Sequence, residues 1–242
     1  TIYQLQGASW AQIGKGQGSG KLRFVDFAQR TVAIGGGESS IKVFSGSNFS
    51  VTSGDPINAD DLWYVNGTGV GAYGRFQFGE VYKSRIYLAG DNNYQPFGSR
   101  LFFSSVISSS GVITWSPQTD YVDINPSDGE NFTALKRFSL ELLCFKPNYI
   151  YRFRTSGVDP DPLIRIGTRS QESIIEGKRG LYFHHDSGFY RYSGGYPEEI
   201  SRPISDIVKA ITFGNYDDIA SWKDDDNIYW SIGNVTVSEA KQ

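Results

Sequence analysis

One pattern recurs five times along the chain and sets the strongest limit on its fold. In each copy, a run of apolar and small residues is followed by a turn and then by a run that ends in an aromatic residue. The copies are TVAIGGGESSIKVFSG (31–46), RIYLAGDNNYQPFGSRLFFSS (85–105), LELLCFKPNYIYRFR (140–154), GLYFHHDSGFYRYSGG (180–195) and the shorter NIYWSIGNVTV (227–237). They recur at roughly 40 to 55 residues, the spacing of four-stranded propeller blades. We therefore expect each copy to form the central hairpin of a blade, with stacked neighbours completing the core.

The remaining sequence also has the character of strands and turns. Its apolar runs are short and are bounded by Gly, Asn, Asp, Ser or Pro. Aromatic residues make up 15% of the chain and there are 28 glycines, a composition that suits strands joined by tight turns. We expect an all-β fold, a β-propeller-like array of about five short four-stranded blades in a single domain over residues 1–242. A twisted β-sandwich is the alternative, and the regular spacing of the copies favours the propeller.

Only one segment, SRPISDIVKAITFG (201–214), has a helical pattern. Its apolar residues fall at the i, i+3, i+4 and i+7 positions of a helix, and they are Ile204, Ile207, Val208 and Ile211. Ser205 is placed to cap the first turn. We expect one short helix near 205–212 that covers an edge of the β domain.

Charge and composition exclude several classes of protein. The formal net charge is −3, and no basic stripe marks a nucleic-acid binder. No apolar run is long enough to span a membrane, and no signal peptide is visible. The chain starts at Thr1 and contains no methionine, so we expect a processed chain or a segment of a longer one. The single cysteine, Cys144, lies in an apolar run and is expected to be buried and structural.

The only two histidines are adjacent and are followed by an aspartate, which raises the question of a metal or catalytic site. On a strand, neighbouring side chains point to opposite faces, so His184 and His185 do not easily bind one metal. The residues that follow, 186–188, are typical of a hairpin turn. We therefore interpret the pair as part of a hairpin and predict no metal site.

Other motifs for catalysis or cofactors are incomplete. The glycine-rich stretch GKGQGSGKL (14–22) has Leu22 where a phosphate-binding loop needs Ser or Thr, and a strand-like run follows it. Scattered carboxylates could meet in a glycosidase site, but strand-end positions are the default; they are Asp26, Glu80, Asp123, Glu141 and Glu172. We predict no catalytic, cofactor-binding or metal residues and no enzymatic activity.

A family likeness covers about residues 75 to 210. Its elements, in order, are SRLFFSS (99–105), WSP (115–117), YVDINP (121–126), GENFTAL (129–135), a Lys-Pro-Asn turn (146–148), GFYRYSGG (188–195) and ISRPI (200–204). In this order and spacing the chain resembles the propeller-like tail-hub proteins of tailed bacteriophages. These are the head-to-tail stabilisation, plug or nozzle components.

The resemblance implies a non-enzymatic structural part of the virion, located in the phage tail or at the head-to-tail junction. Such subunits form homo-oligomeric rings, often hexameric, beneath the portal and adaptor proteins, and genomic DNA passes through the lumen without sequence-specific binding. An acidic or neutral lumen suits that role, because few Lys and Arg residues then hold the phosphates. The alternative is a carbohydrate-binding or glycosidase β-propeller, since 15 tyrosines and 5 tryptophans could stack on sugars.

Two loops are candidates for contacts with partners, because segments that join strands lie at blade ends. In the loop 91–99 we expect Tyr94 and Phe97 to be partly packed. In the loop 223–227 we expect Asp224, Asp225 and Asp226 to be solvated or to face a neighbouring subunit.

Overall fold

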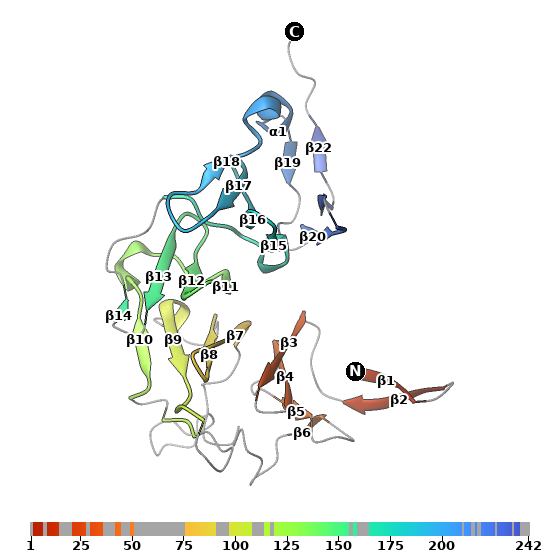
Figure 1. Ribbon diagram of the computed structural model, residues 1–242, viewed down its shortest axis with the longest axis vertical. Helices are drawn as coiled ribbons and strands as arrows, with labels where there is room; N and C mark the ends of the chain where they lie inside the picture. The colour runs from red at the N-terminus through yellow and green to blue at the C-terminus, as the bar shows by residue number, and fades with distance from the viewer. Residues whose placement is uncertain are drawn as a thin grey trace. The chain divides into compact units, whose positions relative to one another are not determined.

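Figure 1 shows a computed structural model of the protein, and strands dominate it. The structure describes residues 2–6, 9–14, 21–27, 30–35, 42–44, 49–50, 76–90, 97–107, 114–116, 119–154, 157–158, 165–209, 211–213, 216, 219–225, 227–233 and 235–237. The all-β class expected from the sequence is confirmed. The chain divides into two compact units, Thr1–Glu130 and Asn131–Gln242. A single domain over residues 1–242 stays a prediction.

Unit 1 contains three antiparallel sheets among its described residues. A hairpin pairs β1 (Ile2–Gln6) with β2 (Ser9–Gly14). The next sheet has the order β3 (Leu22–Phe27), β4 (Arg30–Gly35), β5 (Lys42–Phe44), β6 (Phe49–Ser50). The third contains β7 (Phe78–Tyr82), β8 (Arg85–Ala89), β9 (Arg100–Phe103) and β10 (Tyr121–Asp123), again in chain order. Two 3-10 turns lie in this unit, η2 (Phe97–Ser99) and η3 (Pro126–Asp128).

Unit 2 begins with two four-stranded sheets, both in chain order. The first contains β11 (Ala134–Phe138), β12 (Glu141–Phe145), β13 (Ile150–Arg154) and β14 (Gly157–Val158). The second contains β15 (Ile175–Gly177), β16 (Gly180–His185), β17 (Gly188–Tyr192) and β18 (Glu198–Glu199). Two two-stranded sheets follow, β19 (Ile211–Phe213) with β22 (Val235–Val237) and β20 (Ala220–Lys223) with β21 (Ile228–Ser231). The 3-10 turns are η4 (Gln171–Ser173) and η5 (Arg202–Ile204).

Four of the five repeat copies form the central hairpins of four-stranded sheets. These hairpins are β4–β5, β8–β9, β12–β13 and β16–β17. In β16–β17, for example, Leu181 pairs with Tyr192 and His185 with Gly188, so the turn lies at residues 186–187. The spacing pattern therefore located the middle of each of these sheets.

The expectation of five such hairpins is wrong at the fifth copy. Within 227–237, β21 pairs with β20 and β22 pairs with β19, so the two strands of that copy do not pair with each other. The reason is a local turn that precedes β21. Its Asp224 carboxylate accepts a hydrogen bond from the Asn227 N–H at 2.8 Å, and this turn joins β20 to β21 as a hairpin.

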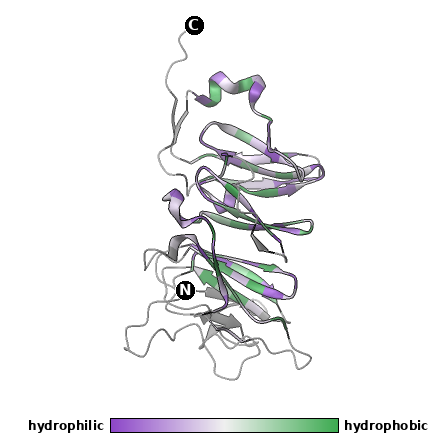
Figure 2. Ribbon diagram, turned by 90° about the vertical axis from the view of Figure 1, so that its left-hand side faces the viewer, coloured by the Kyte–Doolittle hydropathy of each residue, from purple (hydrophilic) through white to green (hydrophobic). Residues whose placement is uncertain are grey.

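The helix is shorter than its sequence pattern predicts. Helix α1 covers Ser205–Lys209, and Ile211 already belongs to β19. The pattern counted four apolar residues on one helical face; of the three whose burial the structure describes, Val208 is buried, while Ile204 and Ile207 are 49% and 61% exposed. The segment around α1 therefore carries both hydrophilic and hydrophobic residues, as Figure 2 shows.

The core of unit 1 lies where residues of the sheets β3–β6 and β7–β10 meet. Its buried members are Phe27, Val32, Ile34, Phe76, Ile86, Leu88, Phe102 and Trp115. Gly79 on β7 allows a close approach, because a Cβ there would lie 2.2 Å from Cδ1 of Ile34 on β4. The two sheets thus meet through side chains of β3 and β4 on one side and of β8 and β9 on the other, with the edge strand β7 packed closely against Ile34.

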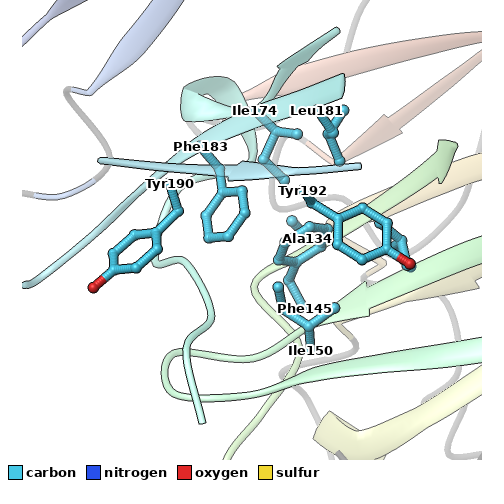
Figure 3. Close-up of a cluster of buried hydrophobic side chains, with 9 residues drawn as sticks. Ala134, Phe145, Ile150, Ile174, Leu181, Phe183, Tyr190 and Tyr192 are labelled. Carbon is cyan, nitrogen blue, oxygen red and sulfur yellow. The ribbon is translucent and has the colours of Figure 1, made fainter. Parts of the chain in front are cut away.

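The core of unit 2 joins the sheets β11–β14 and β15–β18. Figure 3 shows side chains of the second sheet, among them Phe183, pointing towards Phe145 and Ile150 of the first. The rings of Phe145 and Phe183 meet edge to face, with centroids 5.5 Å apart. Cys144 on β12 is fully buried, as expected, and burial raises the pKa of its thiol, so the thiol stays protonated.

The opposite face of the sheet β15–β18 is covered by the ribbon β20–β21. The Trp230 ring lies 4.7 Å from that of Phe189, and its indole N–H donates a hydrogen bond to the Ser173 carbonyl at 3.0 Å. The sheet β15–β18 is therefore packed on both faces within unit 2.

Candidate functional site

The histidine pair has the arrangement that strand alternation predicts, with one ring on each face of the sheet. His184 is 1% exposed and its ring lies 5.1 Å from that of Phe189. The ring of His185 lies 5.9 Å from that of Tyr190, and its Nδ1 is 2.7 Å from Oγ of Ser187. Burial lowers the pKa of His184 to about 4, against a weaker opposing effect of the Asp186 charge.

No potential metal-binding group of three or more His, Cys, Asp or Glu occurs in the part of the chain that the structure describes. The carboxylates considered for glycosidase chemistry are engaged with neighbours instead. Asp26 accepts a hydrogen bond from Thr31 at 2.7 Å, and Asp123 forms a two-point ion pair with Arg100 at 2.7 and 2.8 Å. These bonds are of the kind that stabilises strand pairs.

Glu141 is held most firmly of these carboxylates. It accepts hydrogen bonds from the Tyr192 hydroxyl at 2.6 Å and from Arg154 at 2.6 Å, and Arg152 lies 3.7 Å away. Burial raises the pKa of Glu141, but these two hydrogen bonds and the two positive charges outweigh it and lower the pKa overall. Burial and the bond to Glu141 raise the pKa of Tyr192. The group links β12, β13 and β17, which gives it a structural role.

Replacing Tyr192 by phenylalanine tests that role. The change removes one hydrogen bond to a largely buried carboxylate, and we expect the free energy of unfolding to fall by about 1–2 kcal/mol. Chemical denaturation of the full chain measures the loss. Tyr196→Phe is the matched control, because Tyr196 is 77% exposed and should tolerate the same chemical change. Equal stability of the two variants would contradict the assigned role.

A polar cleft of about 540 Å³ contains part of the acidic run singled out in the sequence. Two hairpin turns form it, β15–β16 and β20–β21, and its lining residues are Gly177, Lys178, Arg179, Tyr182, Lys223, Asp224, Asp225, Asn227 and Ile228. Asp224 and Asp225 are exposed, as expected. Their contact with a partner stays a prediction.

The other predicted contact residues lie outside what the structure describes. Tyr94 and Asp226 are not among the described residues. Phe97 begins η2, but its side chain is not described. Of the five predicted contact residues, the structure therefore describes the side chains of only Asp224 and Asp225, and both line the polar cleft.

Sequence reasoning missed the cations of the cleft, Lys178, Arg179 and Lys223. Lys223 Nζ donates to the Glu176 carbonyl at 2.7 Å, across 47 positions of sequence. Lys178 and Arg179 form the turn between β15 and β16. They directly precede the repeat copy 180–195, and this position was the only feature of the sequence that could have pointed to them. The result is a mixed cleft with both signs of charge.

The ribbon β20–β21 also displays an aromatic pair that the sequence reading did not single out. Trp222 and Tyr229 face each other across the two strands, with rings 5.2 Å apart and 13° from parallel. They are 51% and 40% exposed. Strand alternation in ASWK (220–223) and IYWS (228–231) could have identified them, because it places Trp222 and Tyr229 on the face opposite the one that contains the half-buried Trp230.

Unit 2 also contains a buried lysine. Lys146 is 0% exposed, and its Nζ lies 5.4 Å and 5.8 Å from the ring centres of Tyr151 and Phe132. Such cation–π contacts stabilise a charge away from water. The lysine therefore belongs to the packing of the β12–β13 turn.

Among the described residues, no helix is both long and apolar enough to cross a membrane. No protein-family model and no curated protein matches the chain. Similar solved structures include the computationally designed Ika8 protein, with 11% identity and a TM-score of 0.38 over 83% of this chain and 53% of that one. Another is the extracellular domain of a hybrid two-component system from B. thetaiotaomicron, with 12% identity and a TM-score of 0.37 over 78% of this chain and 28% of that one. The chain thus spans about half of the designed protein and just over a quarter of the bacterial domain.

Proposed function

We propose that this chain is a structural subunit of a bacteriophage tail or head-to-tail connector. The supporting observation is the succession of chain-ordered four-stranded sheets, two in each unit, that pack through their faces. The carboxylates Asp26, Asp123 and Glu141 serve those sheets as internal partners, which suits a scaffold better than a catalyst. The assignment to a bacteriophage rests on the resemblance of residues 75–210 to propeller-like tail-hub proteins.

The sheets are, in this proposal, blades of a propeller-like array. Each four-stranded sheet has its strands in chain order with no crossover, as in a blade. A Greek-key sandwich would instead bring a later strand back beside an earlier one. The pairing of β19 with β22 is the one non-consecutive pairing among the described strands, and it lies in the part where the repeat departs from the pattern.

The subunit assembles, in the same proposal, into a hexameric ring in the virion, in contact with adaptor, portal or other tail proteins. Genomic DNA passes through its lumen and is not bound by sequence. The formal net charge of −3 supports this, because DNA moves freely past a surface that lacks a basic stripe.

The test is to locate the chain in its native source. Antibodies raised against the purified chain should label one end of the tail or the head-to-tail junction in electron micrographs of virions. Mass spectrometry of washed virions should find the chain at the copy number of a ring. Its absence from virions would refute the proposal.

A carbohydrate-binding or glycosidase function is the second candidate, and the exposed pair Trp222 and Tyr229 beside a polar cleft favours it. Aromatic faces and polar side chains are the groups that bind sugars. A purified chain that retains or hydrolyses a glycan, and loses this activity in the Trp222→Ala variant, would support this function over the structural one.

A further inference from the structure

One face of the sheet β15–β18 is covered by a segment that follows α1 in the chain. The segment comprises Tyr216, residues 219–225 and residues 227–231, so it contains the ribbon β20–β21. Strand β20 contacts β15 and η4 (Figure 1). The Ile219 N–H donates to the Tyr216 carbonyl at 3.1 Å, which joins Tyr216 to the ribbon. We call this segment the cover.

The cover is attached to the neighbouring segment 170–176 by four hydrogen bonds, each between a side chain and a backbone carbonyl. They are Ser170 Oγ to the Ile219 carbonyl (2.8 Å), Ser221 Oγ to the Glu172 carbonyl (2.7 Å), Lys223 Nζ to the Glu176 carbonyl (2.7 Å) and Trp230 Nε1 to the Ser173 carbonyl (3.0 Å). Among the described strands, β20 and β21 pair only with each other. A two-stranded ribbon is marginally stable by itself, so the position of the cover depends on these few contacts.

His184 lies in the interface between the cover and the sheet. Its ring lies 5.1 Å from that of Phe189 and 6.4 Å from that of Tyr216, and Phe189 in turn contacts Trp230. Ser173 also contacts both sides, because its hydroxyl accepts the His184 N–H at 3.4 Å and its carbonyl accepts the Trp230 indole N–H. Since His184 is almost fully buried here, moving the cover would expose its ring to water.

The opposite face of the sheet β15–β18 does not depend on the cover. There Phe183 and Tyr190 belong to the core that joins this sheet to β11–β14. The four strands also have their own hydrogen-bonded ladder. The cover can therefore leave while the two sheets stay packed, and local openings of this kind cost less free energy than global unfolding.

We propose that the cover is an acid-sensitive flap, which leaves the sheet β15–β18 more often when His184 is protonated. A charged imidazole is costly to bury, and the open state lets water surround it. The neutral ring instead packs beside Phe189 and Tyr216 and stabilises the closed state. Opening exposes the face of the sheet that carries Phe189. This conformational change goes beyond the proposed function and does not rest on it.

The charges around His184 set the direction of the effect. Burial lowers its pKa to about 4, the Asp186 charge opposes this shift, and the His185 charge adds to it. Asp186 is itself paired with Arg169 at 3.0 Å, and the Arg169 guanidinium lies 5.1 Å from the Tyr216 ring. In the open state the pKa of His184 returns towards its ordinary value of 6.5, so a falling pH favours opening. The other titratable residues on the described elements around the ring are Glu172 on η4, Tyr182 and Arg191 on β16 and β17, Glu198 on β18, Lys223 on the cover, and Asp206 and Lys209 on α1, which contacts β17.

Hydrogen–deuterium exchange of the full chain between pH 7 and pH 4, corrected for the intrinsic exchange rate at each pH, tests the proposal. Amides of β20 and β21 should exchange faster than those of β12 and β13 at every pH, because the cover opens locally. Their protection should fall about a hundredfold from pH 7 to pH 4, the ratio that a pKa of 6.5 in the open state and of about 4 in the closed state implies. Equal protection of the cover and of β12 and β13 would overturn the proposal, because His184 would then act only through global unfolding.

Three variants identify the group and the interface. His184→Gln should abolish most of the pH dependence of the cover, whereas His185→Gln, the same change on the other face of the sheet, should leave it in place. Ser221→Ala removes one of the four attaching hydrogen bonds, so it should increase opening at pH 7 about fivefold and keep the pH dependence. A pH dependence that survives His184→Gln, or a cover that Ser221→Ala does not loosen, would refute the proposed flap.

Discussion

Replacing Phe183 by alanine should lower the free energy of unfolding of unit 2 by about 3–5 kcal/mol. Phe183 is 0% exposed and lies in the core between the sheets β11–β14 and β15–β18. Its ring contacts Phe145 edge to face and stacks on Tyr190 at 5.9 Å. Alanine would remove the ring and leave a cavity that the paired strands cannot close, because their register is fixed by the ladder.

Urea denaturation of the full chain, followed by circular dichroism and tryptophan fluorescence, measures this loss. Tyr196→Ala is the control, since removing an aromatic ring that is 77% exposed should change stability by about 0.5 kcal/mol or less. Phe183→Leu keeps most of the volume and should fall between the two. A loss below about 1 kcal/mol for Phe183→Ala would mean that these two sheets do not pack face to face as described.

The sequence predicted the central hairpins because their determinants are local. In copies such as 180–195, apolar and aromatic residues define two strands, and the turn residues Asp186 and Ser187 lie between them. The fifth copy was misassigned because two turns competed for β21. The turn that begins at Asp224 joins β20 to β21, and it is held by the hydrogen bond from the Asn227 N–H to the Asp224 carboxylate. A pattern of apolar residues contains no information about such a side-chain hydrogen bond.

The candidate site was predictable only in part. An acidic run in a loop is expected to be exposed, and Asp224 and Asp225 are. The cations opposite them come from a turn more than 40 residues earlier, and the link from Lys223 to Glu176 depends on how the ribbon packs on the second sheet. Tertiary packing of this kind leaves no periodic signal in the sequence.

Lowering the pH should destabilise unit 2 by about 3 kcal/mol between pH 6.5 and pH 4, because of His184. Burial lowers the pKa of this residue from an ordinary value of 6.5 to about 4, where the Asp186 charge opposes the shift and that of His185 adds to it. Since the unfolded chain binds a proton at His184 below pH 6.5 and the folded chain does not until about pH 4, stability is full above this range and falls as the pH drops through it.

Equilibrium unfolding at a series of pH values between 7 and 4 measures the slope. His184→Gln removes the titrating group and should flatten the curve over this range, whereas His185→Gln, which changes a partly exposed ring, should leave most of the slope in place. Glu141 acts in a separate range, because its lowered pKa makes its contribution complete above pH 4.5 and lost only as the pH falls further. A slope that survives His184→Gln would show that another group is responsible. A slope that disappears would show that the buried histidine serves the packing of the sheet β15–β18 in its neutral form.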